Sequence, residues 1–403
     1  MQLVAYGAQD IYLTGNPQVT FFKVVYRRYT NFALESIEQT FSGTVDFGRR
    51  VTATVSRNGD LIWKTYLQVD LPVITPVGGG TIAWTRNIGT AMIREVEVEI
   101  GGQRIDRHYG QWMHIWHELT LTGEQEDTFN VMTGNTESLT TAKATTVGGT
   151  LYIPLEFWFC RNAGLALPLI ALQYHEVKFN IEFRPLSECY ILTGTATSIP
   201  PVALANASLW IDYVYLDTDE RRQFAQIAHE YLIEQLQFTG AESFSQTNIR
   251  QRLNFNHPCK EIVWAIQLDA NTDNGANRWT DFTDSGLTPA ATASFWNGYD
   301  HMVDAKLLLN GHDRFTTRKA GYFNLVQPYN HHTRGPSAGI YVYSFALKPE
   351  DHQPSGTCNM SRIDNATLQI TLRSSAPAKL FTYAVNYNVL RVMSGMAGLA
   401  YSN

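Results

Sequence analysis

Histidines and a carboxylate lie close together in one stretch of the sequence, where they could hold a metal ion. His114 and His117 are separated by about one helical turn, Glu118 follows directly, and His108 lies just upstream. Imidazole nitrogens and carboxylate oxygens are common ligands of zinc. The spacing is not the H-E-x-x-H of a zinc protease, however, and tryptophans such as Trp112 flank the histidines. We therefore expect partly buried histidines here and no metal.

Other motifs that could support catalysis have simpler interpretations. His331 and His332 fall in a polar stretch, and we expect them to be solvated. The three glycines at 78–80 are not followed by lysine, which excludes a phosphate-binding P-loop. Asp217 and Asp219 are better explained as residues at a helix start than as an acid/base pair. The sequence thus predicts no catalytic site, no cofactor and no small-molecule substrate, so we do not expect an enzyme.

Three asparagines lie in N-x-S/T sequons, the acceptor sequence for N-linked glycans: Asn206, Asn359 and Asn365. Asn206 and Asn365 fall at or beside predicted strands, where a glycan would interfere with strand pairing. All three are candidate glycosylation sites, and chance occurrence of the sequon is the alternative interpretation.

The composition is typical of a globular chain with two domains. The chain has 403 residues, of which 44% are apolar and 17% are charged. A net charge of −6 argues against direct contact with nucleic acid, because phosphate binding requires clustered lysine and arginine. The N-terminus lacks a signal-peptide pattern, so we expect synthesis in a cytoplasm. The four cysteines form no C-x-x-C and are expected to be free thiols: Cys160, Cys189, Cys259 and Cys358.

The elements that must position these residues are mainly strands. Segments such as Val96–Ile100, Val177–Phe183 and Thr367–Leu372 alternate apolar and polar residues, as strands with one buried face do. The dipeptides Asn58-Gly59, Gly101-Gly102 and Asn310-Gly311 fit two-residue hairpin turns, which need a positive φ.

The two halves of the chain repeat one another in the same order. Four short segments of the first half have counterparts in the second, and the first of these matches aligns Trp63 with Trp264. The pairs begin at Asp60 and Glu261, Val96 and Ala305, Leu151 and Ile340, and Val177 and Ala366. An identical order of matches predicts the same β-topology twice. The strand count and loop lengths suit an eight-stranded jelly roll in each half.

Few helices are expected between these strands. Asp217 followed by Glu220 resembles a capping box, which predicts a short helix over about 219–227 and a strand beginning near Tyr231. A second helix is predicted over Tyr109–Leu119, because Trp112, Ile115, Trp116 and Leu119 share one face. The polar segment 271–297 is expected to form an exposed loop.

The first thirty residues differ from the remainder. Their charge is +2, from three cations against Asp10. Apolar residues recur near helical spacing beside these cations, which suggests a short helix packed under the first jelly roll. A sharper hypothesis is that this arm lies on the inner face of an assembly and contacts other proteins or a membrane through Phe21, Phe22, Lys23, Tyr26, Arg27 and Arg28.

Long stretches of the chain resemble the major capsid proteins of nucleocytoplasmic large DNA viruses, especially those of chlorella-type algal viruses. The resemblance begins with GAQDIYLTGNPQVTFFKVVYRRYTNF (Gly7–Phe32) and includes HEYLIEQLQFTG (His229–Gly240) and YSFALKPEDHQPSGTCNMSRIDNATL (Tyr343–Leu368). It extends from the first residue to the last.

This resemblance implies an all-β double jelly roll with a few short helices in the arm, loops and linker. We expect an N-terminal arm over 1–30, a first jelly roll over 31–216, a linker over 217–230 and a second jelly roll over 231–403. The resemblance further implies a homotrimer that forms a pseudo-hexagonal capsomer of an icosahedral virion shell. The implied partners are neighbouring capsomers, penton and minor capsid proteins and, through the arm, an internal membrane.

Two other function classes compete with a structural shell protein. Jelly rolls also serve as lectins, and Trp279, Trp296 and Tyr299 could stack on sugars if they were exposed. A jelly-roll hydrolase or metalloenzyme would need a metal or a carboxylate pair. A minor capsid paralogue of the same fold is a further alternative within the shell class.

Overall fold

Two five-stranded antiparallel sheets form most of the first half of the chain in the computed structural model, which describes residues 7–195, 198–284 and 300–401. One sheet has the strand order β1-β12-β4-β8, and the short β9 (Leu167–Pro168) pairs with β4. Its strands are β1 (Phe32–Gln39), β12 (Asn206–Leu216), β4 (Leu61–Leu71) and β8 (Gly149–Leu155). The other sheet has the order β2-β3-β10-β6-β7, with β2 (Phe41–Ser42), β3 (Arg50–Thr54), β10 (Val177–Phe183), β6 (Ile93–Ile100) and β7 (Gln103–Tyr109).

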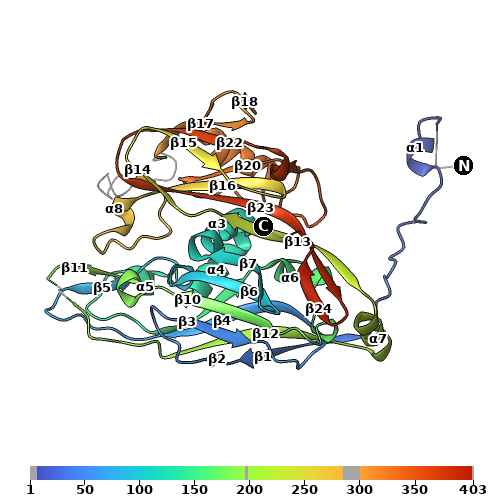
Figure 1. The fold of residues 1–403 in the computed structure, drawn as a ribbon, viewed down its shortest axis with the longest axis horizontal. Coiled ribbons are helices and arrows are strands. Elements are labelled where there is room, and N and C mark those ends of the chain that lie inside the picture. Colours follow the sequence, from blue (N-terminus) through green and yellow to red (C-terminus); the bar gives the residue numbers. More distant parts are fainter. Residues whose placement is uncertain (1–6, 196–197, 285–299, 402–403) are drawn as a thin grey trace, which may run out of the picture.

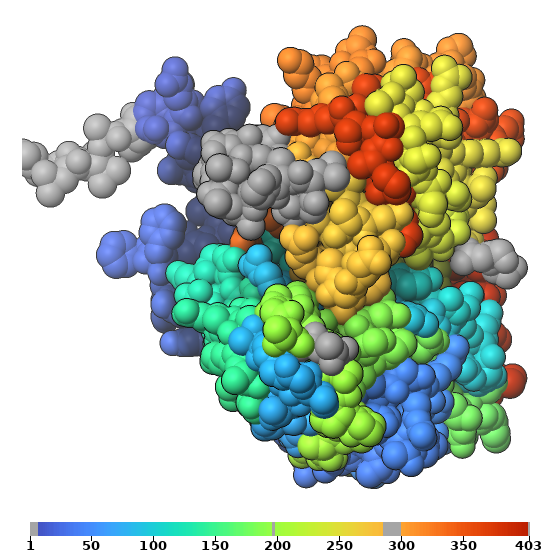
Figure 2. All heavy atoms as spheres, turned by 90° about the vertical axis from the view of Figure 1, so that its left-hand side faces the viewer, coloured from blue at the N-terminus to red at the C-terminus, as the bar shows by residue number. Residues whose placement is uncertain are grey.

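The second half of the chain forms two sheets in the same way. The first has the order β13-β23-β16-β20, formed by β13 (His229–Phe238), β23 (Ala378–Met393), β16 (Pro258–Leu268) and β20 (Ile340–Ser344). The other has the order β15-β22-β17-β18, formed by β15 (Asn248–Leu253), β22 (Ala366–Leu372), β17 (Met302–Leu309) and β18 (His312–Asp313). Figures 1 and 2 show the two halves stacked on one another.

The strand order confirms that the same β-topology occurs twice. Each strand of β1-β12-β4-β8 has its counterpart, in the same chain order, in β13-β23-β16-β20. The four sequence matches fall on β4 and β16, β6 and β17, β8 and β20, and β10 and β22, which hold equivalent places. The chain is therefore a double jelly roll, as the sequence predicted.

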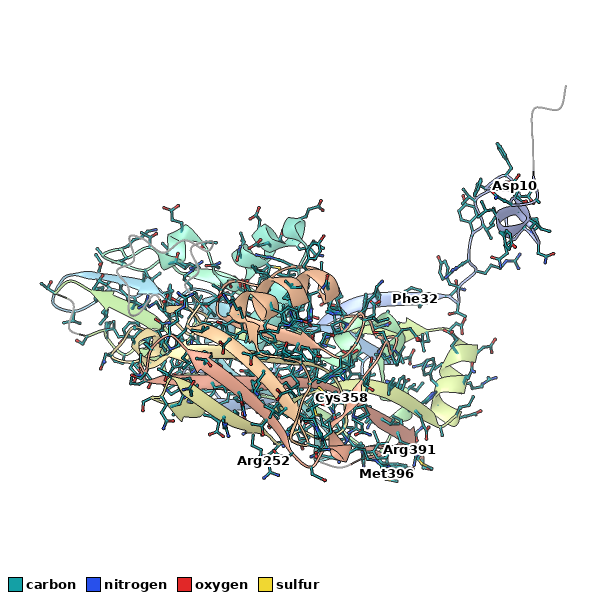
Figure 3. The ribbon with its side chains drawn as sticks, turned by 90° about the horizontal axis from the view of Figure 1, so that it is seen from above. Asp10, Phe32, Arg252, Cys358, Arg391 and Met396 are labelled. Atoms are coloured by element: carbon teal, nitrogen blue, oxygen red, sulfur yellow. The ribbon has the colours of Figure 1, made fainter. Side chains whose placement is uncertain are left out.

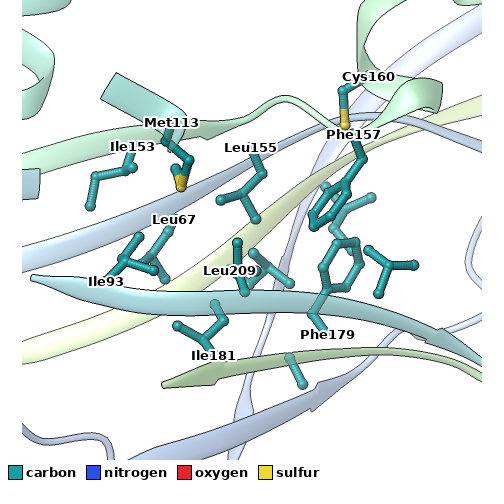
Figure 4. Packing of buried hydrophobic residues seen from close by; sticks show 14 of the residues in the cluster. Leu67, Ile93, Met113, Ile153, Leu155, Phe157, Cys160, Phe179, Ile181 and Leu209 are labelled. Carbon is teal, nitrogen blue, oxygen red and sulfur yellow. The ribbon is translucent and has the colours of Figure 1, made fainter. Parts of the chain in front are cut away.

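Alternating side chains fill the core of the first roll. In β10 every second residue is buried, and Phe179 and Ile181 meet residues of the opposite sheet such as Leu67 and Leu209 (Figure 4). Full burial of each such side chain stabilises the fold by about 1.5–3 kcal/mol relative to exposure. This packing between two sheets holds the roll together.

The predicted hairpin turns are correct in two of three places. Gly101-Gly102 and Asn310-Gly311 both have positive φ at both residues and join paired strands. Asn58-Gly59 does not form a hairpin, because the strands on either side of it belong to different sheets. Gly59 serves a close approach instead: a Cβ there would lie 2.8 Å from the Cβ of Tyr213.

The two longest predicted helices are present. The linker helix α7 (Thr218–Gln226) begins one residue before the predicted range, and the Asp217 side chain accepts a hydrogen bond from the Glu220 amide, 3.0 Å away. The next strand, β13, starts at His229, two residues before the predicted Tyr231. Helix α3 (Gly110–Thr120) matches the prediction over 109–119 and is followed by α4 (Gly123–Thr133).

The remaining elements are short. The helices are α1 (Ile11–Thr14), α2 (Ile88–Ala91), α5 (Glu137–Thr140), α6 (Trp158–Arg161), α8 (Asp269–Thr272) and α9 (Gln327–His331). The strands are β5 (Thr81–Trp84), β11 (Tyr190–Thr193), β14 (Glu242–Phe244), β19 (Arg318–Lys319), β21 (Cys358–Asn359) and β24 (Met396–Leu399). No helix in the described ranges is long and apolar enough to span a bilayer.

Helix α3 lies between the two rolls (Figure 1). Trp112, Ile115, Trp116 and Leu119 of this helix pack with residues of β16, β20 and β23, among them Val263. The central strands of this sheet are consequently covered on both faces, and β16 is buried at ten consecutive positions. The equivalent strand β4 alternates buried and partly exposed residues along most of its length, and its outer face is packed against a helix at its start, where Leu61 and Trp63 cluster with Phe224 of α7.

The expectation of an exposed loop over 271–297 is wrong for its described part, 271–284. Asn271 and Asn277 are buried, and the Asn277 amide donates to the carbonyl oxygens of Ser187 and Tyr190 in the first roll, at 2.7 Å each. The segment is polar because its side chains satisfy backbone groups at the joint between the rolls. Residues 285–297 lie outside the described ranges.

Candidate functional site

The predicted histidine cluster is divided among separate partners. His108 Nε2 lies 3.0 Å from Asp106 Oδ2, and its ring stacks on Phe157. His117 Nδ1 lies 2.5 Å from the carbonyl oxygen of Met113. Within the described ranges, no three histidine, cysteine or acidic side chains gather as metal ligands. Burial lowers the pKa of His117, so its ring is neutral at pH 7.

His332 is not solvated, contrary to the expectation. It lies between two carboxylates, with Nε2 2.7 Å from Glu261 Oε2 and Nδ1 2.9 Å from Glu350 Oε1. Burial opposes protonation of the ring, but the charge of Glu261 and hydrogen bonds to both carboxylates raise the pKa of His332 to about 9. The ring is therefore a buried cation that ties the segment after α9 to strand β16.

A second buried ionic cluster lies beside the first and crosses the joint between the rolls. Lys260 Nζ in β16 lies 2.7 Å from Glu234 Oε1 in β13, and Lys260 is wholly buried. Arg161 of the first roll reaches the other oxygen of Glu234 at 3.1 Å and stacks on Trp116 of α3. A single carboxylate thus joins cations from both rolls.

Further polar contacts cross the joint near the end of α3. Glu118 Oε2 accepts hydrogen bonds from the amide and hydroxyl of Ser337, at 3.1 and 3.0 Å. Arg334 pairs with Glu126 of α4 at 2.7 Å. These contacts and the apolar cluster around α3 fix the orientation of one roll against the other.

The sequence patterns do not predict that these residues lie at the joint between the rolls. The adjacent charges Lys260 and Glu261 interrupt an otherwise apolar strand, which is the signal that could have marked them, since buried charges are rare unless paired. Their partners Glu234 and His332 are distant in sequence. Nothing in the local pattern links them.

An open groove lies between the edge strands of the two rolls. It has a volume of about 440 Å³ and is bordered by β7 and β13. The Gln235 amide donates to the carbonyl oxygen of Ile105, and the Leu236 amide donates to Asp106 Oδ1 at 3.1 Å. Its lining is mostly polar, and its charged residues Arg104, Asp106 and Arg107 are already paired within the chain.

The N-terminal arm stands away from the body of the molecule, between Asp10 and Phe32 (Figure 3). The predicted helix near residues 21–29 is absent from it, and the helix of the arm is the single turn α1. Phe21, Phe22 and Tyr26 are 96%, 92% and 85% exposed. Lys23, Arg27 and Arg28 are exposed as well and form no ion pair with the described residues. The named arm residues are thus available for contacts outside this chain.

The three sequon asparagines are all exposed. Asn206 is the first residue of β12, Asn359 lies in β21, and Asn365 directly precedes β22. The side-chain oxygen of Asn359 accepts a hydrogen bond from Ser361, and that of Asn365 accepts one from Thr367. Trp279, a candidate sugar-stacking residue, has its ring covered by the guanidinium of Arg184 at 3.9 Å. The other two candidates, Trp296 and Tyr299, lie outside the described residues.

Comparison with known proteins gives consistent matches over nearly the whole chain. Residues 20–217 match the family described as the N-terminus of the major capsid protein, and residues 220–398 match the large eukaryotic DNA virus major capsid protein. The major capsid protein of Pyramimonas orientalis virus is 54% identical, over 100% of this chain and 99% of that protein. That of Paramecium bursaria Chlorella virus 1 is 44% identical, with the same coverage.

Solved structures agree with the sequence matches. The structure of the PBCV-1 virus capsid matches with a TM-score of 0.81 at 40% identity, over 95% of this chain and 100% of that one. The Faustovirus major capsid protein matches with a TM-score of 0.82 at 12% identity, over 96% and 94%, which supports the fold alone. A duplicated jelly roll and matches to both domains of one family lead to the same result: the chain belongs to the major capsid proteins of large eukaryotic DNA viruses.

Proposed function

We propose that three copies of this shell protein close into a homotrimer, a pseudo-hexagonal capsomer that tiles an icosahedral virion shell beside neighbouring capsomers and pentons. The observation that carries the proposal is the repeated strand order of the two rolls. A ring of three chains contains six similar jelly rolls, because each chain contributes two. The ring therefore has exact threefold symmetry and an outline that is nearly hexagonal.

A capsomer of this kind requires the two rolls to keep one orientation. The apolar cluster around α3 and the Arg161–Glu234–Lys260 contacts supply that rigidity. The interface between chains in a permanent trimer should bury more than roughly 2,000 Å². Contacts between capsomers should be smaller and more polar, so that misplaced units can leave during assembly.

The proposed division of the chain is an arm over 1–30, rolls over 31–216 and 231–403, and a linker over 217–230. The position of β1, β12 and α7 supports these limits, with the exception that β13 already begins at His229. The family matches, which change between residues 217 and 220, support the same division.

The mass of the purified protein in solution tests the trimer. Light scattering should give about three times the chain mass of 45.4 kDa, at concentrations where shells do not form. A monomeric or dimeric mass across a wide concentration range would contradict the capsomer.

The exposed arm supports an additional role in assembly. Phe21, Phe22 and Tyr26 are almost fully exposed, and its three cations form no ion pair with the described residues, although the chain carries a net charge of −6. We assign it to the inner face of the shell, in contact with minor capsid proteins or an internal membrane.

Deletion of residues 1–30 should leave three chains in each particle but prevent shell assembly, because the described part of the arm stands away from the body of its own chain (Figure 3). The triple variant K23S/R27S/R28S should weaken assembly in part. R222S is the matched control, since Arg222 is an exposed cation of α7. Loss of the trimer on deletion of the arm would contradict the proposal that the rolls form the trimer and the arm serves shell assembly.

A shell role implies no catalytic activity, no cofactor and no direct nucleic-acid contact, with synthesis and assembly in the host cytoplasm. The sequon residues Asn206, Asn359 and Asn365 remain candidate glycosylation sites, since all three are exposed. Peptide mapping of protein taken from virions tests each of them separately.

A further inference from the structure

Two cysteines that are distant in sequence lie opposite each other in neighbouring strands. Strand β21 pairs with the start of β16, and Cys358 is the direct partner of Cys259 in this antiparallel register. Residues in such positions have Cα atoms about 4.5–5.5 Å apart and side chains on the same face of the sheet. Disulfides form at Cα separations of about 4.4–6.8 Å, so the register meets this condition without movement of the backbone.

Both side chains also belong to one apolar cluster. Cys259 is part of the buried core of the second roll, and Cys358 packs against that same core. The cluster therefore includes both cysteines, and the Cys259 thiol donates to the carbonyl oxygen of Glu261 at 3.1 Å. Of the two, Cys259 is wholly buried, and Cys358 is only partly buried. An oxidant from solution can reach Cys358 first, with Cys259 directly behind it.

The other two cysteines provide the contrast. Cys160 lies in α6, with its sulfur 3.3 Å from Thr65 Oγ1, and Cys189 has its sulfur 3.5 Å from the carbonyl oxygen of Pro185. Neither faces a cysteine in the strand pairs of the described ranges. Only the pair in the second roll is arranged for internal oxidation.

We propose that Cys259 and Cys358 are a thiol pair that closes to a disulfide when the shell protein meets a low-molecular-weight disulfide such as oxidised glutathione. The Cys358 thiolate attacks one glutathione sulfur, which breaks the glutathione S–S bond and releases one glutathione thiolate. The Cys259 thiolate then attacks Cys358 Sγ and releases the second glutathione. The two cysteines lose two electrons and two protons, and oxidised glutathione is reduced to two molecules of glutathione.

The surroundings of the pair make the reaction slow at neutral pH. Burial raises the pKa of the Cys358 thiol and raises that of Cys259 well above its ordinary value. Because the thiolate is the attacking species, the rate of oxidation should rise as the pH is increased from 7 to 9. A chain in a reducing cytoplasm would keep both thiols, and a particle in an oxidising medium would close them.

Closure would fasten the segment between β20 and β22 to the central strand β16. The segment is at present held there by noncovalent contacts: the pairing of β21 with β16, a hydrogen bond from the Met360 amide to the carbonyl oxygen of His257 at 3.0 Å, and one from Lys260 Nζ to the carbonyl oxygen of Asp351 at 3.2 Å. A covalent link across this place restricts the unfolded chain over the long segment between the two cysteines. The thermal midpoint of the oxidised protein should therefore be several degrees higher than that of the reduced protein.

The full chain, purified in reduced form, tests the proposal. After incubation with oxidised glutathione at pH 8, thiol titration should decrease from four thiols to two. The intact mass should fall by two hydrogen atoms, and a non-reducing digest should yield one cross-linked peptide pair containing Cys259 and Cys358. Four remaining thiols, a stable glutathione adduct on Cys358, or a cross-link to Cys160 or Cys189 would each overturn it.

Two variants separate the pair from the other thiols. C358S should retain its three thiols and show no change in thermal midpoint on oxidation. C160S, the matched control, should still lose two thiols and gain the same number of degrees as the unaltered chain. If C160S and C358S responded alike, the stabilisation would not come from this pair.

Discussion

The buried imidazolium of His332 shows how a single residue can couple the fold to pH. The free ring has a pKa near 6.5, and the pKa of His332 in the folded chain is about 9. A folded pKa above the unfolded one contributes stability that is fully present below pH 6.5 and is lost as the pH rises through 9. The shift corresponds to roughly 3 kcal/mol.

We therefore expect the free energy of unfolding to decrease by roughly 2–3 kcal/mol more between pH 7 and pH 10 than it does in the variant H332Q/E261Q. The double variant is the suitable reference because it removes the imidazolium together with the charge of its main partner. Urea denaturation at several pH values measures the difference. Parallel pH profiles of the two proteins would contradict the assignment of a protonated ring.

Gly59 is a second residue whose role became visible only in three dimensions. Its φ is ordinary, but a Cβ would lie 2.8 Å from Tyr213. Tyr213 is wholly buried and its hydroxyl donates to the carbonyl oxygen of Ser56 at 2.7 Å, so it has little room to move. We expect G59A to destabilise the chain by roughly 1–3 kcal/mol.

Thermal denaturation measures this effect against G123A as control. Gly123 begins α4, and a Cβ there would meet nothing within 4 Å. G123A should leave the thermal midpoint nearly unchanged. Equal effects of the two substitutions would mean that close approach to Tyr213 is not what requires glycine at residue 59.

At the scale of elements, helix α3 determines how the rolls are joined. Trp112 is 1% exposed, and its ring lies 5.1 Å from that of Tyr383 in the second roll. W112A should remove roughly 3–5 kcal/mol from the joint, as large-to-small substitutions of buried aromatic residues do. Because the loss falls on the contact between the rolls, calorimetry should resolve two unfolding transitions in place of one.

W210A is the control for this prediction. Trp210 stacks on Tyr66 in the outer sheet of the first roll, away from the joint. Its loss should lower the thermal midpoint while a single transition remains. A single transition in both variants would show that α3 does not couple the rolls.

The elements predicted correctly from the sequence are those in which the spacing of apolar residues indicates a single buried face. The alternation in β10 and β22 and the apolar face of α3 are examples, because local period and burial agree there. The continuous burial of β16 was not predictable, since it depends on a helix from the other half. In the arm, helical spacing alone predicts a helix that is absent. A short helix without a packing partner is not stable, because the free energy gained by its few hydrogen bonds does not offset the unfavourable free energy of nucleation.

The joint was the least predictable part of the candidate site. Polar residues such as Asn277 and His332 were interpreted as loop residues, because polar composition is usually a property of the surface. Each is instead buried against a partner distant in sequence. A single sequence carries no signal for such pairings.

At the scale of the whole molecule, the two rolls are not independent units. The core cluster of the first roll includes Ile233, Leu390, Val392 and Ala397 from the second half of the chain. The C-terminal strand β24 brings part of this set, and the Gly395 carbonyl accepts a hydrogen bond from the Tyr174 amide at 2.9 Å. Figure 1 shows β24 beside the first roll.

We therefore expect a fragment of residues 1–227 to aggregate when it is produced alone, since its core would lack these side chains. Production together with residues 228–403 should yield a purified complex of both fragments. Size-exclusion chromatography and circular dichroism measure the outcome. A monomeric fragment with cooperative unfolding would show that the first roll folds by itself.

The position of α3 also bears on how such genes can change. The helix is encoded in the first copy of the repeat, whereas the sheet surface that receives it is encoded in the second. Recombination between related viruses that exchanged only one copy would unite a helix and a sheet with separate mutational histories. The two copies should therefore be inherited together, and crossover points should be rare between the codons for residues 110 and 385.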